Sequence, residues 1–149
     1  MATREIIFRG KRADDDKWIY GYYLEEYRKD KTKKSCIFSS WADGEKVFNH
    51  KEMVIPETVG QYTGLTDKNG NRIFEGDIVC TRFPKECEHA GNICSLGDIQ
   101  FRDGMFGIEW TQWKNDTFWG LRRIDEDFHK EIEIIGNIYD SPELVEVGV

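Results

Sequence analysis

Four side chains of the types that bind zinc lie within one segment of the sequence: Cys80, Cys87, His89 and Cys94. Zinc in structural sites is held tetrahedrally by thiolates and imidazoles, so four such groups would complete a site. The segment has no C-x-x-C pair, however, and a hairpin with Cys80 and Cys94 on its two strands would place the other two groups at its tip. The sequence therefore favours unliganded thiols and a surface histidine, and it leaves metal binding by these residues open.

A second candidate for ligand chemistry is the glycine-rich stretch VGQYTGLTDKNGNRIFEGDIV, residues 59–79. An EF-hand calcium loop counted from Asp67 would need Gly at its sixth position and Glu at its twelfth, but Arg72 and Ile78 stand there. A phosphate loop would need a Gly-Lys pair, and lysine follows none of the glycines in this stretch. We therefore expect no bound calcium, nucleotide or other cofactor. Asn69-Gly70 instead predicts a hairpin with a type I′ turn.

The sequence shows no recognisable set of residues for nucleophilic or acid–base catalysis. Ser39 and Ser40 lie outside any G-x-S-x-G elbow. The three histidines stand among polar residues, and the run Asp14-Asp15-Asp16 is typical of a solvated turn. We therefore predict that the protein is not an enzyme, and we assign no catalytic residue.

Basic and aromatic side chains are concentrated around one N-terminal loop. The basic residues are Arg28, Lys29, Lys31, Lys33 and Lys34, and the flanking aromatic residues are Tyr22, Tyr23, Tyr27 and Trp41. Cationic groups beside aromatic platforms are what proteins use to bind single-stranded nucleic acid. The formal net charge of −7 disfavours nonspecific attraction to nucleic acid or to an anionic membrane. Nucleic-acid binding by this loop is therefore an alternative hypothesis, beside the simpler one of a charged loop whose aromatic neighbours lie in the core.

The elements that must position these side chains are predicted to be mostly β-strands. Branched and aromatic residues outnumber Leu and Ala, which favours pleated, half-buried surfaces over helices. Apolar side chains occupy every second position of one segment, as on one strand face: Trp18, Tyr20, Tyr22 and Leu24. Asp103-Gly104 and other turn signals separate several short strands, the pattern of a small barrel or roll with one or two short helices. Residues 42–53 show no clear period and leave a helical turn around NHKEM as one alternative.

Smaller signals complete this outline. Two Gly-Asp-Ile segments, residues 76–78 and 97–99, each predict a turn that leads into a strand. A weak helical spacing near Phe128 predicts one or two helical turns, and the DSPEL segment predicts a capped turn.

The sequence contains no segment that would direct the chain to or across a membrane. Charges interrupt any apolar stretch among the first ten residues, so these do not form a signal peptide. No apolar run approaches the roughly 18 residues of a membrane-spanning helix. We therefore expect a cytoplasmic protein in which the four cysteines are reduced thiols.

Three blocks of the sequence carry a family resemblance: REIIFRGKRADDDKWIYGYY at the start, PETVGQYTGLTDKNGNRIFEGDIV in the middle and EIIGNIYDSPEL near the end. In this order they resemble the YopX family, a group of small bacterial and phage proteins. The resemblance implies a mostly β fold with an SH3-like barrel or roll, often encoded by phages and prophages, and it implies no activity. We accordingly expect residues 1–149 to form one YopX-like domain, with a hairpin subregion 1–55 packed on a barrel 56–149.

The lack of a catalytic set and the family resemblance together favour a non-enzymatic accessory protein of a phage, a prophage or another mobile element. Such a protein would bind a protein partner or assemble into a homo-oligomer, through a sheet edge or an exposed tryptophan patch. Gln61, Tyr62 and Thr63 would contribute to binding if they lie exposed beside a groove, although we expect the ring of Tyr62 to be largely buried.

Overall fold

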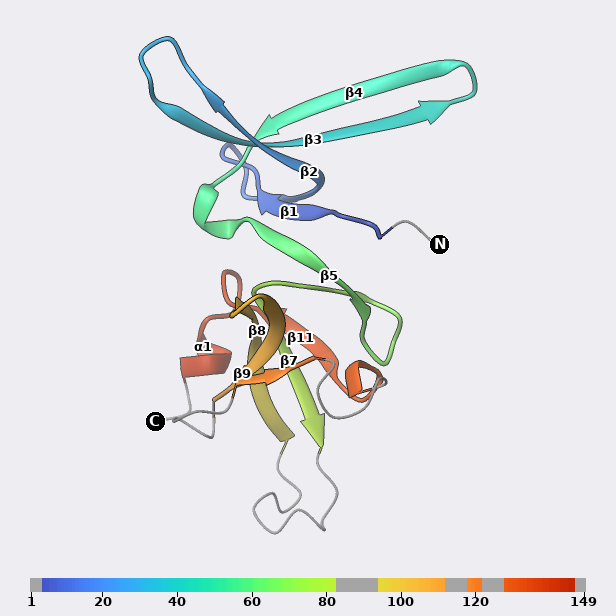
Figure 1. Ribbon diagram of the computed structural model, residues 1–149, viewed down its shortest axis with the longest axis vertical. Coiled ribbons are helices and arrows are strands. Elements are labelled where there is room, and N and C mark those ends of the chain that lie inside the picture. Colours follow the sequence, from blue (N-terminus) through green and yellow to red (C-terminus); the bar gives the residue numbers. More distant parts are fainter. Residues whose placement is uncertain (1–3, 83–93, 112–117, 122–127, 147–149) are drawn as a thin grey trace. The chain divides into compact units, whose positions relative to one another are not determined.

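The computed structural model describes residues 4–82, 94–111, 118–121 and 128–146, with the backbone alone at Arg82 and Cys94. The described elements are almost entirely β-strands in antiparallel sheets, which confirms the predicted mostly β class (Figure 1). The chain forms two compact units, Met1–Tyr62 and Thr63–Val149, which we call the first and the second unit. The prediction that residues 1–149 form one domain, in which a hairpin subregion 1–55 packs on a barrel 56–149, stays a prediction.

The first unit is an antiparallel sheet with the strand order β4-β3-β2-β1-β5. Its elements are β1 (Phe8–Lys11), β2 (Trp18–Tyr27), β3 (Lys33–Asp43), β4 (Lys46–Met53), the 3-10 turn η1 (Pro56–Thr58) and the beginning of β5 (Gly60–Thr66). Strands β1 and β2 form an antiparallel hairpin. A helical turn around NHKEM is wrong, because these residues pair with β3 as the second strand of a hairpin.

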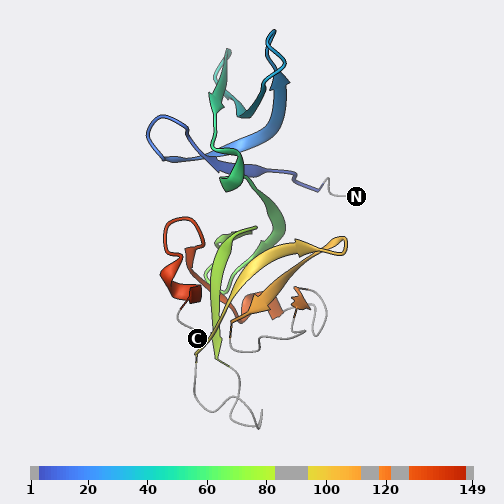
Figure 2. The same cartoon turned by 90° about the vertical axis from the view of Figure 1, so that its left-hand side faces the viewer.

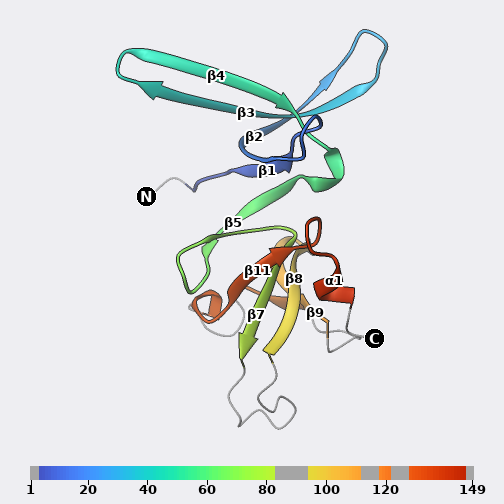
Figure 3. The same cartoon turned by 180° about the vertical axis from the view of Figure 1, so that it is seen from behind.

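Strand β2 changes its partner at Gly21. The strand pairs with β1 up to this residue and with β3 from Tyr22 onward. Only glycine fits here, because a Cβ atom on Gly21 would lie 2.2 Å from the backbone oxygen of Phe38. The buried apolar residues of these strands and of the segment after β4 include Cys36, Ile37 and Val54. Beyond Gly21 the β2–β3 and β3–β4 hairpins diverge, as Figures 1 and 3 show from opposite sides.

The outer part of the β3–β4 hairpin, residues 39–50, has only two strands, and we call it the arm. Strand β2 accompanies β3 as far as Phe38, so no third strand among the described residues supports the arm. A two-residue turn, Gly44-Glu45, closes it, and the φ of Gly44 is +61°, in the region that such turns require. The arm and the β2–β3 hairpin form two separate prongs of the first unit (Figure 2).

The second unit is built on a five-stranded antiparallel sheet with the order β10-β9-β8-β7-β11. Its elements are β6 (Arg72–Phe74), β7 (Asp77–Arg82), β8 (Cys94–Arg102), β9 (Met105–Trp110), β10 (Phe118–Gly120), η2 (Phe128–Lys130), β11 (Glu133–Asn137) and α1 (Glu143–Glu146). The core consists of Ile73, Val79, Ile99, Ile108, Trp110, Leu121, Phe128 and Ile132. Among the described strands the sheet ends at β10 and β11 without closing into a barrel, and the SH3-like topology stays a prediction.

The turn between β5 and β6 is organised by a side chain that the sequence analysis did not single out. The predicted hairpin is present, but only Gly70 has a positive φ, +81°, whereas a type I′ turn needs two such residues. Asp67 instead accepts hydrogen bonds from the backbone N–H groups of Asn69 and Asn71, both at 2.9 Å. A buried carboxylate therefore replaces the expected backbone geometry.

The remaining turn predictions have mixed outcomes. Asp103-Gly104 is a two-residue turn with both φ values positive, and Gly76 precedes β7 as expected. Gly97 does not open a strand but lies inside β8, where a Cβ atom would approach Ile108 Cγ2 to 2.5 Å. The DSPEL segment leads into α1 as predicted, and the described part of the helical segment near Phe128 forms the 3-10 turn η2.

Candidate functional site

The end of the arm carries large apolar side chains that the first unit leaves exposed. Trp41 lies directly opposite Phe48, and their rings stack at a centroid distance of 5.5 Å and an interplanar angle of 15°. The two residues are 52% and 40% exposed. Val47, opposite Ala42, lies on the other face of the arm and is 67% exposed. The arm therefore presents apolar groups on both faces, beyond the reach of any third strand.

Cross-strand contacts explain how a two-stranded arm keeps its shape. Isolated hairpins are marginal in water, and each favourable cross-strand pair contributes about 0.2–1 kcal/mol. Besides the aromatic stack, Ser40 Oγ donates a hydrogen bond of 2.8 Å to Asn49 Oδ1. These contacts stabilise the arm locally, but they leave one side of each aromatic ring without a neighbour from the first unit. Exposed apolar clusters of this kind typically mark interaction sites.

The base of the arm is fixed by an ion-pair network with the β1–β2 turn. Arg12 bonds Asp14 at 2.9 Å and lies 3.4 Å from Glu52 of β4, and His50 lies 2.7 Å from the same carboxylate. The hydrogen bond from Arg12 lowers the pKa of Asp14. Ala13 also donates its backbone N–H to the carbonyl of Met53, at 3.0 Å. The predicted solvated turn thus covers the inner end of the β4 edge.

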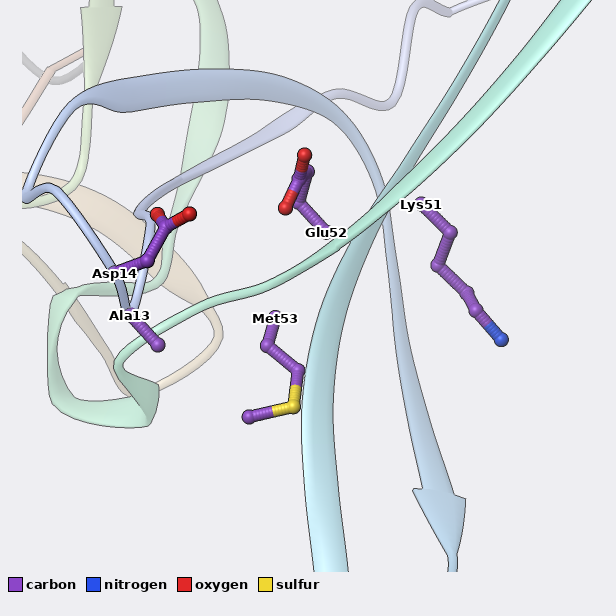
Figure 4. Close-up of a pocket in the computed structure, with 5 residues that line it drawn as sticks. All are labelled: Ala13, Asp14, Lys51, Glu52 and Met53. Atoms are coloured by element: carbon purple, nitrogen blue, oxygen red, sulfur yellow. The ribbon is translucent and has the colours of Figure 1, made fainter.

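A shallow hollow of about 500 Å³ opens where this turn meets β4, and we call it the hollow. It is lined by Ala13, Asp14, Lys51, Glu52 and Met53. Figure 4 shows the carboxylates of Asp14 and Glu52 pointing to the same side, whereas Lys51 points away from them on the other face of β4. Lys51 Nζ binds Glu26 at 2.6 Å, which raises the pKa of the lysine. The hollow therefore presents two carboxylates, whereas the Lys51 ammonium is turned away to Glu26.

The predicted basic loop forms the tip of the β2–β3 hairpin, and part of its charge is compensated. Lys33 binds Glu25 at 2.7 Å, and Lys34 lies directly opposite Glu26. The other three basic residues, Arg28, Lys29 and Lys31, lie in the exposed connection between the strands. The flanking aromatic residues are not all in the core, since Tyr22 is 60% and Tyr27 74% exposed. Nucleic-acid binding by this loop stays a prediction.

The segment Gln61-Tyr62-Thr63 is largely buried. Tyr62 is buried, as expected, and Thr63 is buried with its hydroxyl donating to the backbone oxygen of Ile73 at 2.8 Å. Gln61 is half-buried and pairs with Phe8 of β1 across the sheet. A partner-binding role of these three residues stays a prediction.

Two of the cysteines, Cys36 and Cys80, differ in oxidation state. Cys36 is a buried free thiol, whereas Cys80 is disulfide-bonded, so the expectation of four reduced thiols is wrong for Cys80. Cys87 and His89 of the candidate zinc set lie outside the described residues. Within the described ranges, no group of three or more metal-ligating side chains comes together.

Sequence reasoning missed one pair of carboxylates on the second unit. Asp98 of β8 lies directly opposite Glu109 of β9. Gln100 Nε2 donates to Asp98 Oδ2 at 2.9 Å, and Arg102 binds Glu109 at 2.9 Å. Burial raises the pKa of Asp98, and the neighbouring charge of Glu109 raises it further. The two-residue turn at Asp103-Gly104 fixes which residues of β8 and β9 lie opposite each other. The pairing of Asp98 with Glu109 could therefore have been inferred from the turn that the sequence predicts.

Replacing Asp98 with Asn is expected to stabilise the second unit at neutral pH. A pKa raised in the folded state means that the ionised carboxylate is disfavoured there, so its cost appears as pH rises through the folded-state pKa. We expect a gain on the order of 1 kcal/mol or less at pH 7, which disappears below the pKa of the unfolded chain. Urea unfolding at pH 7 and pH 3.5 measures it; an equal effect at both values would contradict this explanation.

The architecture defines a β-rich protein of two antiparallel-sheet units with a projecting hairpin arm, and none of the helices in the described ranges has the length and hydropathy to cross a membrane. The family model described as "YopX protein" matches residues 7–146, so the chain belongs to the YopX family. The crystal structure of protein EF1440 from Enterococcus faecalis is similar, with a TM-score of 0.51 and 23% identity over 96% of this chain and 99% of the other. That likeness concerns the fold alone. No match to a curated protein was found.

Proposed function

We propose that this chain is a non-enzymatic accessory protein of a phage, a prophage or another mobile element, and that it acts by binding protein surfaces through its arm. The observation that carries the proposal is the exposed Trp41–Phe48 stack at the end of a two-stranded projection. Family membership supports the genomic context and supplies no enzymatic activity.

The chemistry of the arm suits protein binding. Large aromatic side chains lose little conformational entropy on binding and dominate the energetics of interfaces. The charged residues of the arm lie around the apolar ones: Asp43, Glu45 and Lys46 at the turn and His50 toward the base. An apolar centre with a polar rim is the usual composition of a protein–protein interface.

The arm makes a direct prediction for binding. Replacing both Trp41 and Phe48 with Ser should abolish association, because each aromatic anchor typically contributes about 2 kcal/mol, or about 30-fold in affinity. The measurement is affinity capture from a lysate of the host bacterium, together with light scattering of the purified chain. Tyr27→Ser on the other hairpin is the matched control, since Tyr27 is 74% exposed but lies off the arm.

One result would support the proposal and another would contradict it. Capture or self-association that is lost in the Trp41/Phe48 variant and kept in Tyr27→Ser supports the arm as the binding surface. If neither self-association nor capture differs between the wild type and the Trp41/Phe48 variant, the proposal is wrong. Circular dichroism on all three proteins shows whether the first unit remains folded.

A further inference from the structure

Strand β4 is an open sheet edge along the arm. It is the outermost strand of its sheet. The two-residue turn makes Asp43 and Lys46 a hydrogen-bonded pair, so the backbone groups of even-numbered β4 residues point inward to β3, as the bond from Val54 N–H to the Ser35 carbonyl confirms. The N–H and C=O groups of Val47, Asn49 and Lys51 therefore point outward. Within the described ranges, no strand or turn covers them until Met53.

We propose, on the basis of the proposed arm function, that the partner of the arm is a second copy of this chain, whose β4 pairs antiparallel with β4 across a two-fold axis at Phe48. A two-fold axis at this position makes Val47 and Asn49 of opposite copies hydrogen-bonded pairs, which uses the outward backbone groups. It places Phe48 opposite Phe48 of the second copy. The two stacks then join into one strip of four aromatic rings on one face of the joined sheet, which covers the side of each Phe48 ring that faces the β4 edge.

The aromatic rings select this register, and the charges along the edge are compatible with it. Pairing about Phe48 brings Glu45 of each copy opposite Lys51 of the other, and Lys46 of each copy diagonally beside Glu52 of the other. The contacts are made twice because the interface is symmetric. Shifting the axis to Asn49 would instead set Lys46 opposite Glu52 and would separate the two Phe48 rings.

The hollow gives independent support to the same register. In this pairing the Gly44-Glu45 turn of one arm reaches Lys51 and Glu52 of the other, and these residues line the hollow. A Cβ atom on Gly44 would have nothing within 4 Å, so the turn has no neighbour in its own copy. The turn of each arm would thus lie at a space that the partner leaves open.

The first test removes an outward hydrogen-bond donor at Asn49; because it also removes the side-chain bond from Ser40, Asn49→Ala, which loses that bond but keeps the N–H, is its control. Proline is tolerated at an edge position whose N–H faces solvent, so Asn49→Pro should keep the monomer folded while it blocks edge pairing. We expect sedimentation equilibrium to show a dimer for the wild type and a dissociation constant raised about tenfold or more for Asn49→Pro. Circular dichroism of the variant should remain that of the wild type.

The second test addresses the register. Glu45→Lys alone should weaken the dimer several-fold, and adding Lys51→Glu should restore it; the unfolding midpoint of each variant is measured because Lys51 also binds Glu26. The comparison is the Lys46→Glu and Glu52→Lys pair, whose side chains are directly opposite for an axis at Asn49 and only diagonal for an axis at Phe48, so its rescue should be the larger one only for an axis at Asn49; its unfolding midpoint is measured too because Glu52 also binds Arg12 and His50. Rescue by that pair alone would overturn the register.

Failure of this inference and failure of the proposed function give different results. A wild type that stays monomeric at every concentration, or a dimer unaffected by Asn49→Pro, overturns the β4 pairing. If such a monomer still retains another protein through Trp41 and Phe48, the arm remains the binding surface and only the identity of its partner is wrong. If neither occurs, both proposals fail.

Discussion

Replacing Asp67 with Ala is expected to destabilise the second unit by about 3–5 kcal/mol. Its carboxylate is 3% exposed and accepts three backbone hydrogen bonds, from Asn69, Asn71 and Ile134. Alanine would remove three hydrogen bonds to a charged acceptor, each worth about 1.5–3 kcal/mol, and the total stays at the lower end because the N–H groups of the exposed Asn69 and Asn71 can bind water instead. Urea unfolding followed by tryptophan fluorescence measures the loss, because Trp110 lies in the core of this unit.

The same carboxylate makes stability depend on pH with a defined sign. Burial alone would raise the pKa of Asp67, but the hydrogen bonds from Ile134, Asn71 and Asn69 outweigh burial and lower it. A lowered folded-state pKa gives stability that is complete above the unfolded pKa of about 3.9 and is lost as pH falls through the folded value. The difference between wild type and Asp67→Ala should therefore shrink on acidification. A difference that is constant from pH 7 to pH 2.5 would contradict this account.

The β-rich class and several turns could be predicted because they depend on short segments. Asp103-Gly104 supplies both positive φ values within two residues, and strand β2 was visible from its alternating aromatic side chains. Asp67 could not be recognised in the same way. One of its three donors, Ile134, is 67 residues away in the sequence. The role of the carboxylate therefore depends on the tertiary fold that places β11 beside the turn.

The arm was missed for a physical reason. Hydrophobic alternation arises when one strand face is buried and the other is solvated. Both faces of β4 are exposed along the arm, so KVFNHKEM has no such alternation and a helical turn could be considered. The candidate binding residues Trp41 and Phe48 were therefore visible only after the Gly44-Glu45 turn had fixed their pairing. The candidate site differs from the core in this respect, because its apolar groups contact each other across the arm but remain largely exposed.

Replacing Gly21 with Ala is expected to cost the first unit about 3 kcal/mol, the upper range for an added group in a tightly packed site. A Cβ atom there would lie 2.2 Å from the oxygen and 2.9 Å from the carbon of the Phe38 carbonyl group. These are backbone atoms, so no side-chain rotation relieves the contact, and β3 must move away from β2. Thermal unfolding by circular dichroism measures the effect.

Gly10→Ala is the matched control, since its Cβ atom would meet only the side chain of Val54, at 3.1–3.3 Å. We expect Gly10→Ala to cost about 1 kcal/mol of stability. An equal loss of stability in both variants would show that the close approach at Gly21 does not require glycine more than Gly10 does. The comparison also concerns function. At Gly21 strand β2 changes its partner from β1 to β3, and β3 continues beyond this point into the arm. Gly21→Ala should therefore weaken arm-dependent association even at temperatures where the chain remains folded, whereas Gly10→Ala should not.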